Sequence, residues 1–207
     1  ENGGNLVKKI DVTDRSNTIA NSIPSDLIAI TANGTTKANY YGAMVYVPDY
    51  EGKITKINVT SVGTLYQSTQ LFDTEASTTN GRYILTGAEA TVNSDSNLWL
   101  YFGTGDTQKL QDQISGTQNR LYGIKDKDFP NFISLGSSGT VLNCRNTTTQ
   151  TSCPTNSDLG WYIDLPNYQK LTAQPTIKNT SVYFPVYEPT TGTNICNTGK
   201  AILKATG

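Results

Sequence analysis

Four aspartates in the second half of the chain are the residues whose type and spacing best suit chemistry. They are Asp106, Asp112, Asp126 and Asp128. Carboxylates so close together serve as the acid and base of glycoside hydrolysis or as hard ligands for a cation. Each also falls at an expected strand end or loop, where Asp accepts hydrogen bonds from free backbone N–H groups. Caps and solvated loop ends are the favoured interpretation, so we predict no catalytic residue and no metal site.

The chain contains no histidine. This absence excludes Ser-His-Asp and Cys-His catalysis, and it excludes metal sites with imidazole ligands. Gly103-Thr104-Gly105 resembles part of a phosphate-binding loop, but the Gly-Lys-Ser/Thr completion is missing. The sequence therefore predicts a protein that is not an enzyme and has no cofactor.

Three cysteines are present, and two of them lie close together in a polar stretch. We predict a disulfide between Cys144 and Cys153, which implies an oxidising compartment. The alternative is a pair of free thiols. A zinc site is disfavoured because three thiols and no histidine make a poor ligand set. Cys196 is left over, and its partner is expected on a segment outside this sequence.

Aromatic side chains offer surfaces on which sugars stack. Trp99 and Trp161 lie within apolar runs, so packing in the core is the favoured interpretation for both. Tyr40, Tyr41 and Tyr50 lie near turns instead. We therefore predict that these three tyrosines contribute to a binding surface.

The composition limits the class of protein. A chain of 207 residues can bury one core, and we expect residues 1–207 to form a single domain. Charged residues are 16% and Thr, Ser, Asn and Gly are abundant, which favours strands and turns. The net charge of −1, without a basic block, argues against nucleic-acid binding. No apolar run reaches membrane-spanning length. The start at Glu1, without an initiator Met, is typical of a processed chain.

The elements that position these residues begin with an apolar strand expected at residues 98–102 and stopped by glycines. Asp106 is expected to cap a short helix after it, with Leu110 and Ile114 on one face. A second strand is expected at residues 121–124. This order of strand, glycine turn and strand recurs along the chain.

An internal repeat supports the same architecture. Residues 1–12 and 49–59 each read as a turn followed by a strand, and both end Lys-Ile-Asp/Asn-Val. The period of about 45 residues matches a four-stranded propeller blade. Further strands are expected at residues 27–30, 40–47, 65–72, 82–92, 131–135, 161–165, 181–187 and 200–205. We predict an all-β, β-propeller-like repeat of four-stranded blades, complete or incomplete, with about four to five blades. A β-sandwich is the alternative, since counting strands does not separate the two.

Several stretches share their pattern with one family. Residues 45–58 are similar to its strand pair around Tyr-x-Gly-Asp-x-x-Gly-Asn, and residues 100–105 to its Tyr-Phe-Gly-Thr-Gly strand end. Residues 121–126 are similar to the family's next strand. Residues 160–165 match the family's Gly-Trp-Tyr-x-Asp-Leu motif, and residues 196–199 match its Cys-x-x-Gly ending. The chain thus resembles the C-terminal β-propeller domain of the type IV pilus tip adhesin and biogenesis factor family, PilY1/PilC.

This resemblance implies an extracellular or cell-surface protein, associated with pili and acting in pilus biogenesis and surface attachment. Its expected partners are pilus components, the remaining blades of a larger propeller, and a host or matrix ligand. The family's Asp-rich calcium loop corresponds to residues 31–39, which contain no carboxylate and include Lys37. Calcium binding is therefore not expected. Thr55 and Ile57 replace the usual Trp and Phe of the strand pair, so this blade should pack differently.

Two other functions stay open at this stage. One is a structural subunit of a surface filament, whose open sheet edge is completed by a strand from its neighbour. The other is a quinoprotein-like propeller enzyme, because residues 201–207 faintly resemble the Ala-Leu-Asp-x-x-Thr-Gly repeat of that class. The second requires many copies of the repeat, which are not visible.

Overall fold

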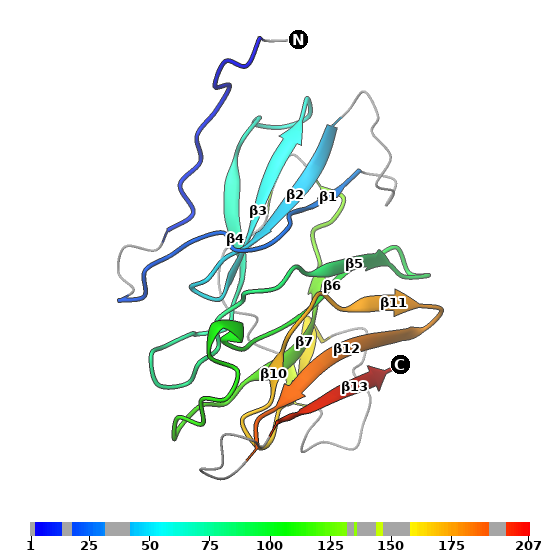
Figure 1. The fold of residues 1–207 in the computed structure, drawn as a ribbon. Helices are drawn as coiled ribbons and strands as arrows, with labels where there is room; N and C mark the ends of the chain where they lie inside the picture. Colours follow the sequence, from blue (N-terminus) through cyan, green and yellow to red (C-terminus); the bar gives the residue numbers. More distant parts are fainter. Residues whose placement is uncertain are drawn as a thin grey trace.

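The computed structural model shows an all-β chain made of three sheets (Figure 1). It describes residues 3–13, 18–31, 42–131, 135, 144–146, 158–190 and 198–207, with the backbone alone at 144–146. Within these ranges the only helix is a 3₁₀ turn, η1 (Thr107–Lys109). The predicted fold class, a propeller-like series of antiparallel sheets, is confirmed.

The first sheet is a four-stranded antiparallel meander. Its strands, in spatial order, are β1 (Ile28–Ile30), β2 (Gly42–Pro48), β3 (Lys53–Thr60) and β4 (Ser68–Asp73). A tight turn joins β2 to β3, because the Asp49 carbonyl accepts from the Gly52 N–H at 3.0 Å. Gly52 has a φ of +83°, and a Cβ there would collide with the Thr74 side chain. Glycine is therefore required at this corner.

The middle sheet has five strands. They are β5 (Glu89–Val92), β6 (Leu98–Gly103), β7 (Arg120–Asp126), β9 (Gly160–Asp164) and β8 (Cys144–Asn146), in spatial order. The first four form an antiparallel meander, and β8 adds to the outer edge parallel to β9. The sheet thus repeats the four-strand pattern of the first sheet with one strand added.

The third sheet is organised around one long strand. It contains β10 (Lys170–Leu171), β11 (Thr176–Lys178), β12 (Ser181–Glu188) and β13 (Lys200–Thr206). β13 pairs with β12 along its length, whereas β10 and β11 pair with opposite ends of β12. Since β13 occupies one edge, β10 and β11 share the other edge as two parts of one interrupted strand.

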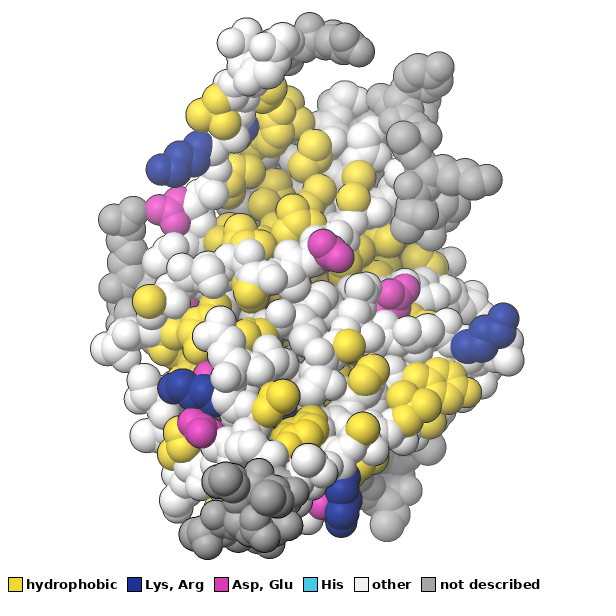
Figure 2. Space-filling model, in the orientation of Figure 1, with side chains coloured by type: hydrophobic (Ala, Val, Ile, Leu, Met, Phe, Trp, Pro, Cys, Tyr) yellow, Lys and Arg dark blue, Asp and Glu magenta, His cyan; other side chains and the backbone are white. Residues whose placement is uncertain are grey.

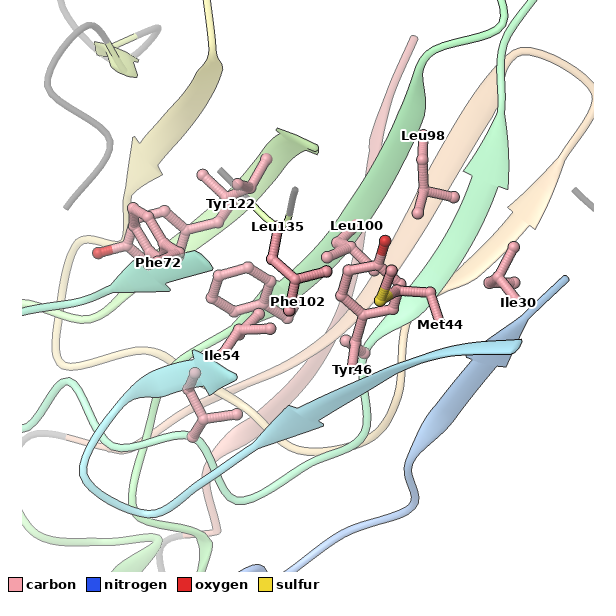
Figure 3. Close-up of a cluster of buried hydrophobic side chains, with 13 residues drawn as sticks. Ile30, Met44, Tyr46, Ile54, Phe72, Leu98, Leu100, Phe102, Tyr122 and Leu135 are labelled. Atoms are coloured by element: carbon pink, nitrogen blue, oxygen red, sulfur yellow. The ribbon is translucent and has the colours of Figure 1, made fainter. Parts of the chain in front are cut away.

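The middle sheet lies between the other two (Figure 1) and has a core on each face. Figure 3 shows the core that faces the first sheet. Because side chains alternate along a strand, Leu98, Leu100 and Phe102 of β6 pack against the first sheet. Tyr101 faces the third sheet instead. The residues that meet the β6 side chains from the first sheet are Ile30, Met44, Tyr46, Ile54 and Phe72. Stacked sheets of this kind are the arrangement of neighbouring propeller blades.

On its other face, the middle sheet accommodates a large ring next to a glycine. A Cβ at Gly123 of β7 would lie 2.5 Å from Cε2 of Trp161 on β9. The Trp161 ring also meets Phe184 of β12 edge-to-face, with the ring centroids 6.3 Å apart. Trp161 thus contributes to packing between sheets, as expected for a tryptophan in an apolar strand.

A fully buried ion pair joins the first sheet to the middle sheet. Lys56 of β3 donates from Nζ to both carboxylate oxygens of Asp126 at 3.0 Å, and neither side chain is exposed. The Tyr46 hydroxyl donates to Asp126 Oδ2 at 2.7 Å, and the Asp128 N–H donates to Oδ1 at 3.1 Å. These bonds compensate for removing both charges from water.

The middle and third sheets also meet through one edge strand of each. β5 and β11 are in contact. Just before β11, Gln174 donates from Nε2 to the Ala88 carbonyl at 2.9 Å and to Glu89 Oε2 at 3.0 Å. The middle and third sheets therefore approach each other at these two strands.

Some sequence expectations were wrong in detail. Residues 5–13 contain no strand, although the repeat with residues 49–59 predicted one. The expected helix after Asp106 is only η1, and Leu110 and Ile114 are exposed by 38% and 50% rather than packed. Of the strand expected at residues 82–92, only β5 forms. The number of blades and the division into one domain stay predictions.

Candidate functional site

A cleft of about 220 Å³ opens where the ends of the three sheets meet. In an antiparallel meander, every second connection lies at the same end of the sheet. The cleft is lined by the β2–β3, β4–β5 and β6–β7 connections and by the start of β10. The residues that line the cleft include Tyr50, Tyr83, Asp106, Asp112, Asn119 and Lys170. The cleft therefore draws on all three sheets.

One wall of the cleft is a pair of stacked tyrosines. The rings of Tyr50 and Tyr83 have centroids 4.7 Å apart and planes that differ by 9°. The backbone positions both residues: the Tyr50 N–H donates to the Ser22 carbonyl at 2.9 Å, and the Gly105 N–H donates to the Tyr83 carbonyl at 3.0 Å. Burial raises the pKa of both phenols, and the nearby Asp106 carboxylate raises it further.

Charged residues support the turn that carries Tyr50. Asp49 and Glu51, the two residues that flank Tyr50 in the sequence, are almost fully buried, and the Lys53 ammonium pairs with both carboxylates. Asn21 donates to Asp49 Oδ2 at 3.2 Å and accepts from the Glu51 N–H at 3.2 Å. Burial raises the pKa of Asp49, while its hydrogen bonds and the charge of Lys53 act in the opposite direction. The turn is thus rigidly held, and Tyr50 projects from a fixed base.

The opposite wall is the turn around η1. Asp106 accepts from the Gln108 N–H at 3.0 Å and so caps η1, as the sequence predicted. Lys170 donates from Nζ to three backbone carbonyls: those of Leu110 and Asp112, each at 3.0 Å, and that of Lys109. Burial lowers the pKa of Lys170, and the charges of the neighbouring aspartates counteract that effect. Lys170 is consequently a structural residue that holds this turn in place.

The floor of the cleft is a closed hydrogen-bond network. Buried Asn119 donates from Nδ2 to the Gln169 carbonyl at 2.9 Å and accepts from Thr104 Oγ1 at 3.3 Å. Thr104 Oγ1 in turn accepts from the Arg120 N–H at 2.9 Å. Because these polar atoms already have partners, the floor fixes the shape of the cleft.

A ligand in the cleft would bind to the side-chain oxygens that make no hydrogen bond within the protein. Among the described residues, the phenol oxygens of Tyr50 and Tyr83 make no hydrogen bond, and neither does the Asp112 carboxylate. The same part of the chain holds no group of three side chains suited to a metal ion. A stacked aromatic pair, phenol hydroxyls and carboxylate oxygens around a small space make a binding site for a polar ligand.

The three-sheet arrangement can be compared with solved structures. The fold is similar to that of the Pseudomonas aeruginosa PilY1 C-terminal domain. The TM-score is 0.55 at 15% sequence identity, over 71% of this chain and 41% of that one. The chain therefore corresponds to less than half the length of the PilY1 domain. No protein-family model and no curated protein sequence matches the chain.

The resemblance to the PilY1/PilC family, inferred from the motifs, is thus supported at the level of fold. Residues 160–165, which carry the Gly-Trp-Tyr-x-Asp-Leu motif, contribute β9, which lies between β7 and β8 in the middle sheet. In the described part of the chain, no helix has the length and apolarity needed to cross a membrane.

The predicted site residues fall in different places. Tyr50 lines the cleft, whereas Tyr40, Tyr41 and Cys153 lie outside the described residues. Cys144 belongs to β8, where only the backbone is described, so the predicted disulfide stays a prediction. The rejected calcium loop, residues 31–39, is described only at its first residue.

Sequence reasoning missed Tyr83. It was expected inside a continuous strand over residues 82–92, and tyrosines in strands usually pack. The available signal was the preceding Asn80-Gly81, a dipeptide typical of turns. In the structure Gly81 has a φ of +68° and lies in the wall of the cleft.

Proposed function

We propose that this chain is a non-enzymatic, pilus-associated protein of PilY1/PilC type that acts at the cell surface in type IV pilus biogenesis and attachment. The observation that carries the proposal is the fold likeness to the PilY1 C-terminal domain. The order of the sequence motifs adds independent support. The surface is compatible with this role, since Figure 2 shows acidic and basic side chains scattered on one face without a basic patch.

The chemistry of the cleft favours binding over catalysis. Asp106 caps a turn and Lys170 holds three carbonyls, so both serve the structure. The whole chain lacks histidine. A general base placed next to a nucleophile, which acyl or phosphoryl transfer requires, has no counterpart among the described lining residues.

Fractionation of pili from the producing bacterium tests the assignment. Pili are sheared from cells that carry an epitope-tagged chain, and the sheared fraction is probed alongside cell lysate. We expect the chain in the sheared fraction of wild-type cells, and its loss from that fraction when the major pilin gene is deleted. Recovery only from the cytoplasm, or in the sheared fraction regardless of pilin, would contradict the proposal.

We also propose that the chain forms part of a larger propeller, with a further blade covering the outer face of the third sheet. This face carries Tyr183, Pro185 and Tyr187, whose cross-strand partners are Ala205, Leu203 and Ala201. Leu203 is 66% exposed. Within the described residues β13 pairs on one edge alone. An apolar face beside an open edge is suited to a covering partner.

Sedimentation of the chain on its own tests the covering blade. Without that blade, the apolar face should drive self-association that increases with concentration, and Leu203→Lys should suppress it. Lys8→Glu, in the exposed N-terminal segment, is the control and should leave association unchanged. A wild-type chain that stays monomeric at high concentration would show that the face needs no partner.

A further inference from the structure

We infer that the cleft between Tyr50, Tyr83 and Asp112 is a saccharide-binding site that takes a single neutral pyranose ring. The inference rests on the proposed attachment function for its biological role, and it names the ligand class of that surface. Binding itself depends only on the geometry of the cleft.

Size restricts the ligand to one small ring. The cleft measures about 220 Å³. Pockets for drug-sized ligands measure roughly 300–1,000 Å³, so this space suits one compact unit of a chain that continues into solvent. A side chain of a protein partner would also fit by size. The charge of the cleft must therefore decide between a charged side chain and a neutral sugar ring.

The aromatic wall suits a ring that has one apolar face. Tyr50 and Tyr83 are stacked with planes 9° apart, so they form one rigid block with both residues partly exposed. The C–H groups on one face of a pyranose are apolar and can lie against an outer face of this stack, which the partner ring does not cover. Because the stack already exists without a ligand, binding requires little ordering of side chains.

The charges in the cleft are balanced, which favours a neutral ligand. Asp106 and Asp112 contribute two negative charges, and Lys109 and Lys170 contribute two positive charges. Lys170 is already saturated by three backbone carbonyls. Because the two signs cancel, neither a cation nor an anion gains a net electrostatic attraction that would offset the loss of its hydration. A neutral ligand does not incur that loss.

Hydrogen-bonding capacity then selects a polyhydroxyl ligand. The Asp112 carboxylate makes no hydrogen bond among the described residues, and Asp106 uses one oxygen for its cap. A carboxylate accepts strong, charge-assisted bonds from hydroxyl donors. The phenols of Tyr50 and Tyr83 are protonated at neutral pH, as tyrosines ordinarily are, and burial raises their pKa values further. They can donate to ring and hydroxyl oxygens, so the cleft offers both acceptors and donors to adjacent sugar hydroxyls.

Saturation-transfer difference NMR on the full chain tests the inference. The probes are methyl pyranosides of glucose, galactose, mannose, fucose and N-acetylglucosamine, with arginine amide and acetate as charged competitors. We expect at least one pyranoside to bind with a Kd in the millimolar range. Its C–H protons should receive the strongest transfer, and both competitors should bind more weakly.

Matched variants locate the binding. Asp112→Asn removes one charge from an exposed side chain without disturbing the core, and it should weaken pyranoside binding about tenfold. Tyr50→Ala should reduce binding to below detection. The control is Asp95→Asn in the exposed β5–β6 turn, and it should leave the Kd unchanged. Circular dichroism of each variant establishes that it is folded.

Three results would overturn the inference: no saturation transfer to any pyranoside, an unchanged Kd in folded Asp112→Asn, or tighter binding of arginine amide than of every pyranoside. The pilus fractionation described above separates this outcome from failure of the proposed function. A chain that fractionates with pili but binds no pyranoside refutes only the saccharide site. A chain that binds a pyranoside but fractionates without pili refutes only the pilus assignment.

Discussion

The buried pair of Lys56 and Asp126 should be the most sensitive point in the contact between the first and middle sheets. Both side chains are fully buried, and the ammonium reaches both carboxylate oxygens at 3.0 Å. Removing one partner leaves an uncompensated charge in the core, which typically costs about 3–5 kcal/mol. A domain is stable by only about 5–15 kcal/mol. Lys56→Met or Asp126→Asn alone should therefore remove a large share of the stability.

The double variant distinguishes charge from packing. Lys56→Met combined with Asp126→Asn removes both charges, and the new amide still offers one oxygen to the Tyr46 hydroxyl. Its destabilisation should fall short of the sum of the single variants by about 2 kcal/mol or more, because directly paired residues couple strongly. The loss in either single variant would then reflect the charge left without a partner.

Urea unfolding followed by fluorescence of Trp99 and Trp161 measures these changes. Each single substitution should lower the midpoint by about 1–3 M. The matched control is Lys127→Met, because Lys127 pairs with Asp128 at 2.7 Å while their side chains are 49% and 25% exposed. That variant should lose less than about 1 kcal/mol. Single-variant losses that add to within about 0.5 kcal/mol in the double variant would refute a coupled buried pair.

Two further predictions concern packing and titration. Gly123→Ala should destabilise the fold by about 1–3 kcal/mol and shift the tryptophan emission, because its Cβ would lie 2.5 Å from the Trp161 ring; an unchanged urea midpoint would show that the ring moves freely. In an absorbance titration at alkaline pH, Tyr50 and Tyr83 should ionise above the ordinary tyrosine pKa, and Asp106→Asn should lower both values. Because the unfolded chain releases these protons first, stability should fall as pH rises from about 10 towards the folded pKa values; stability that rises there would contradict the assigned burial.

Features of the fold that depend on local pattern could be predicted from the sequence. β6 and β7 lie close to their expected positions, because short apolar runs encode both strands. Glycines stop the first run, and charged residues stop the second. The Asp106 cap was predicted for the same reason, since capping involves only the next few residues. Local chemistry was sufficient in each case.

Features that require a distant partner could not be predicted. Lys56 and Asp126 are 70 residues apart in the sequence, and the residues that flank each of them do not show that the two side chains meet in the core. The stack of Tyr50 on Tyr83 likewise joins two connections of different sheets. Residues 5–13 show the converse: their sequence suits a strand, but no neighbouring strand pairs with them.

The fully enclosed ion pair also determines how the joint between the first two sheets responds to the medium and to load. Dissolved salt screens the attraction between solvent-exposed charges, but it screens a buried ion pair far less. The joint should therefore hold equally well in dilute and in saline surroundings. Each sheet is a separate hydrogen-bonded ladder among the described strands. A pull along the chain would consequently separate the first sheet from the middle sheet, which meet through side chains such as Lys56 and Asp126, before any strand is drawn out.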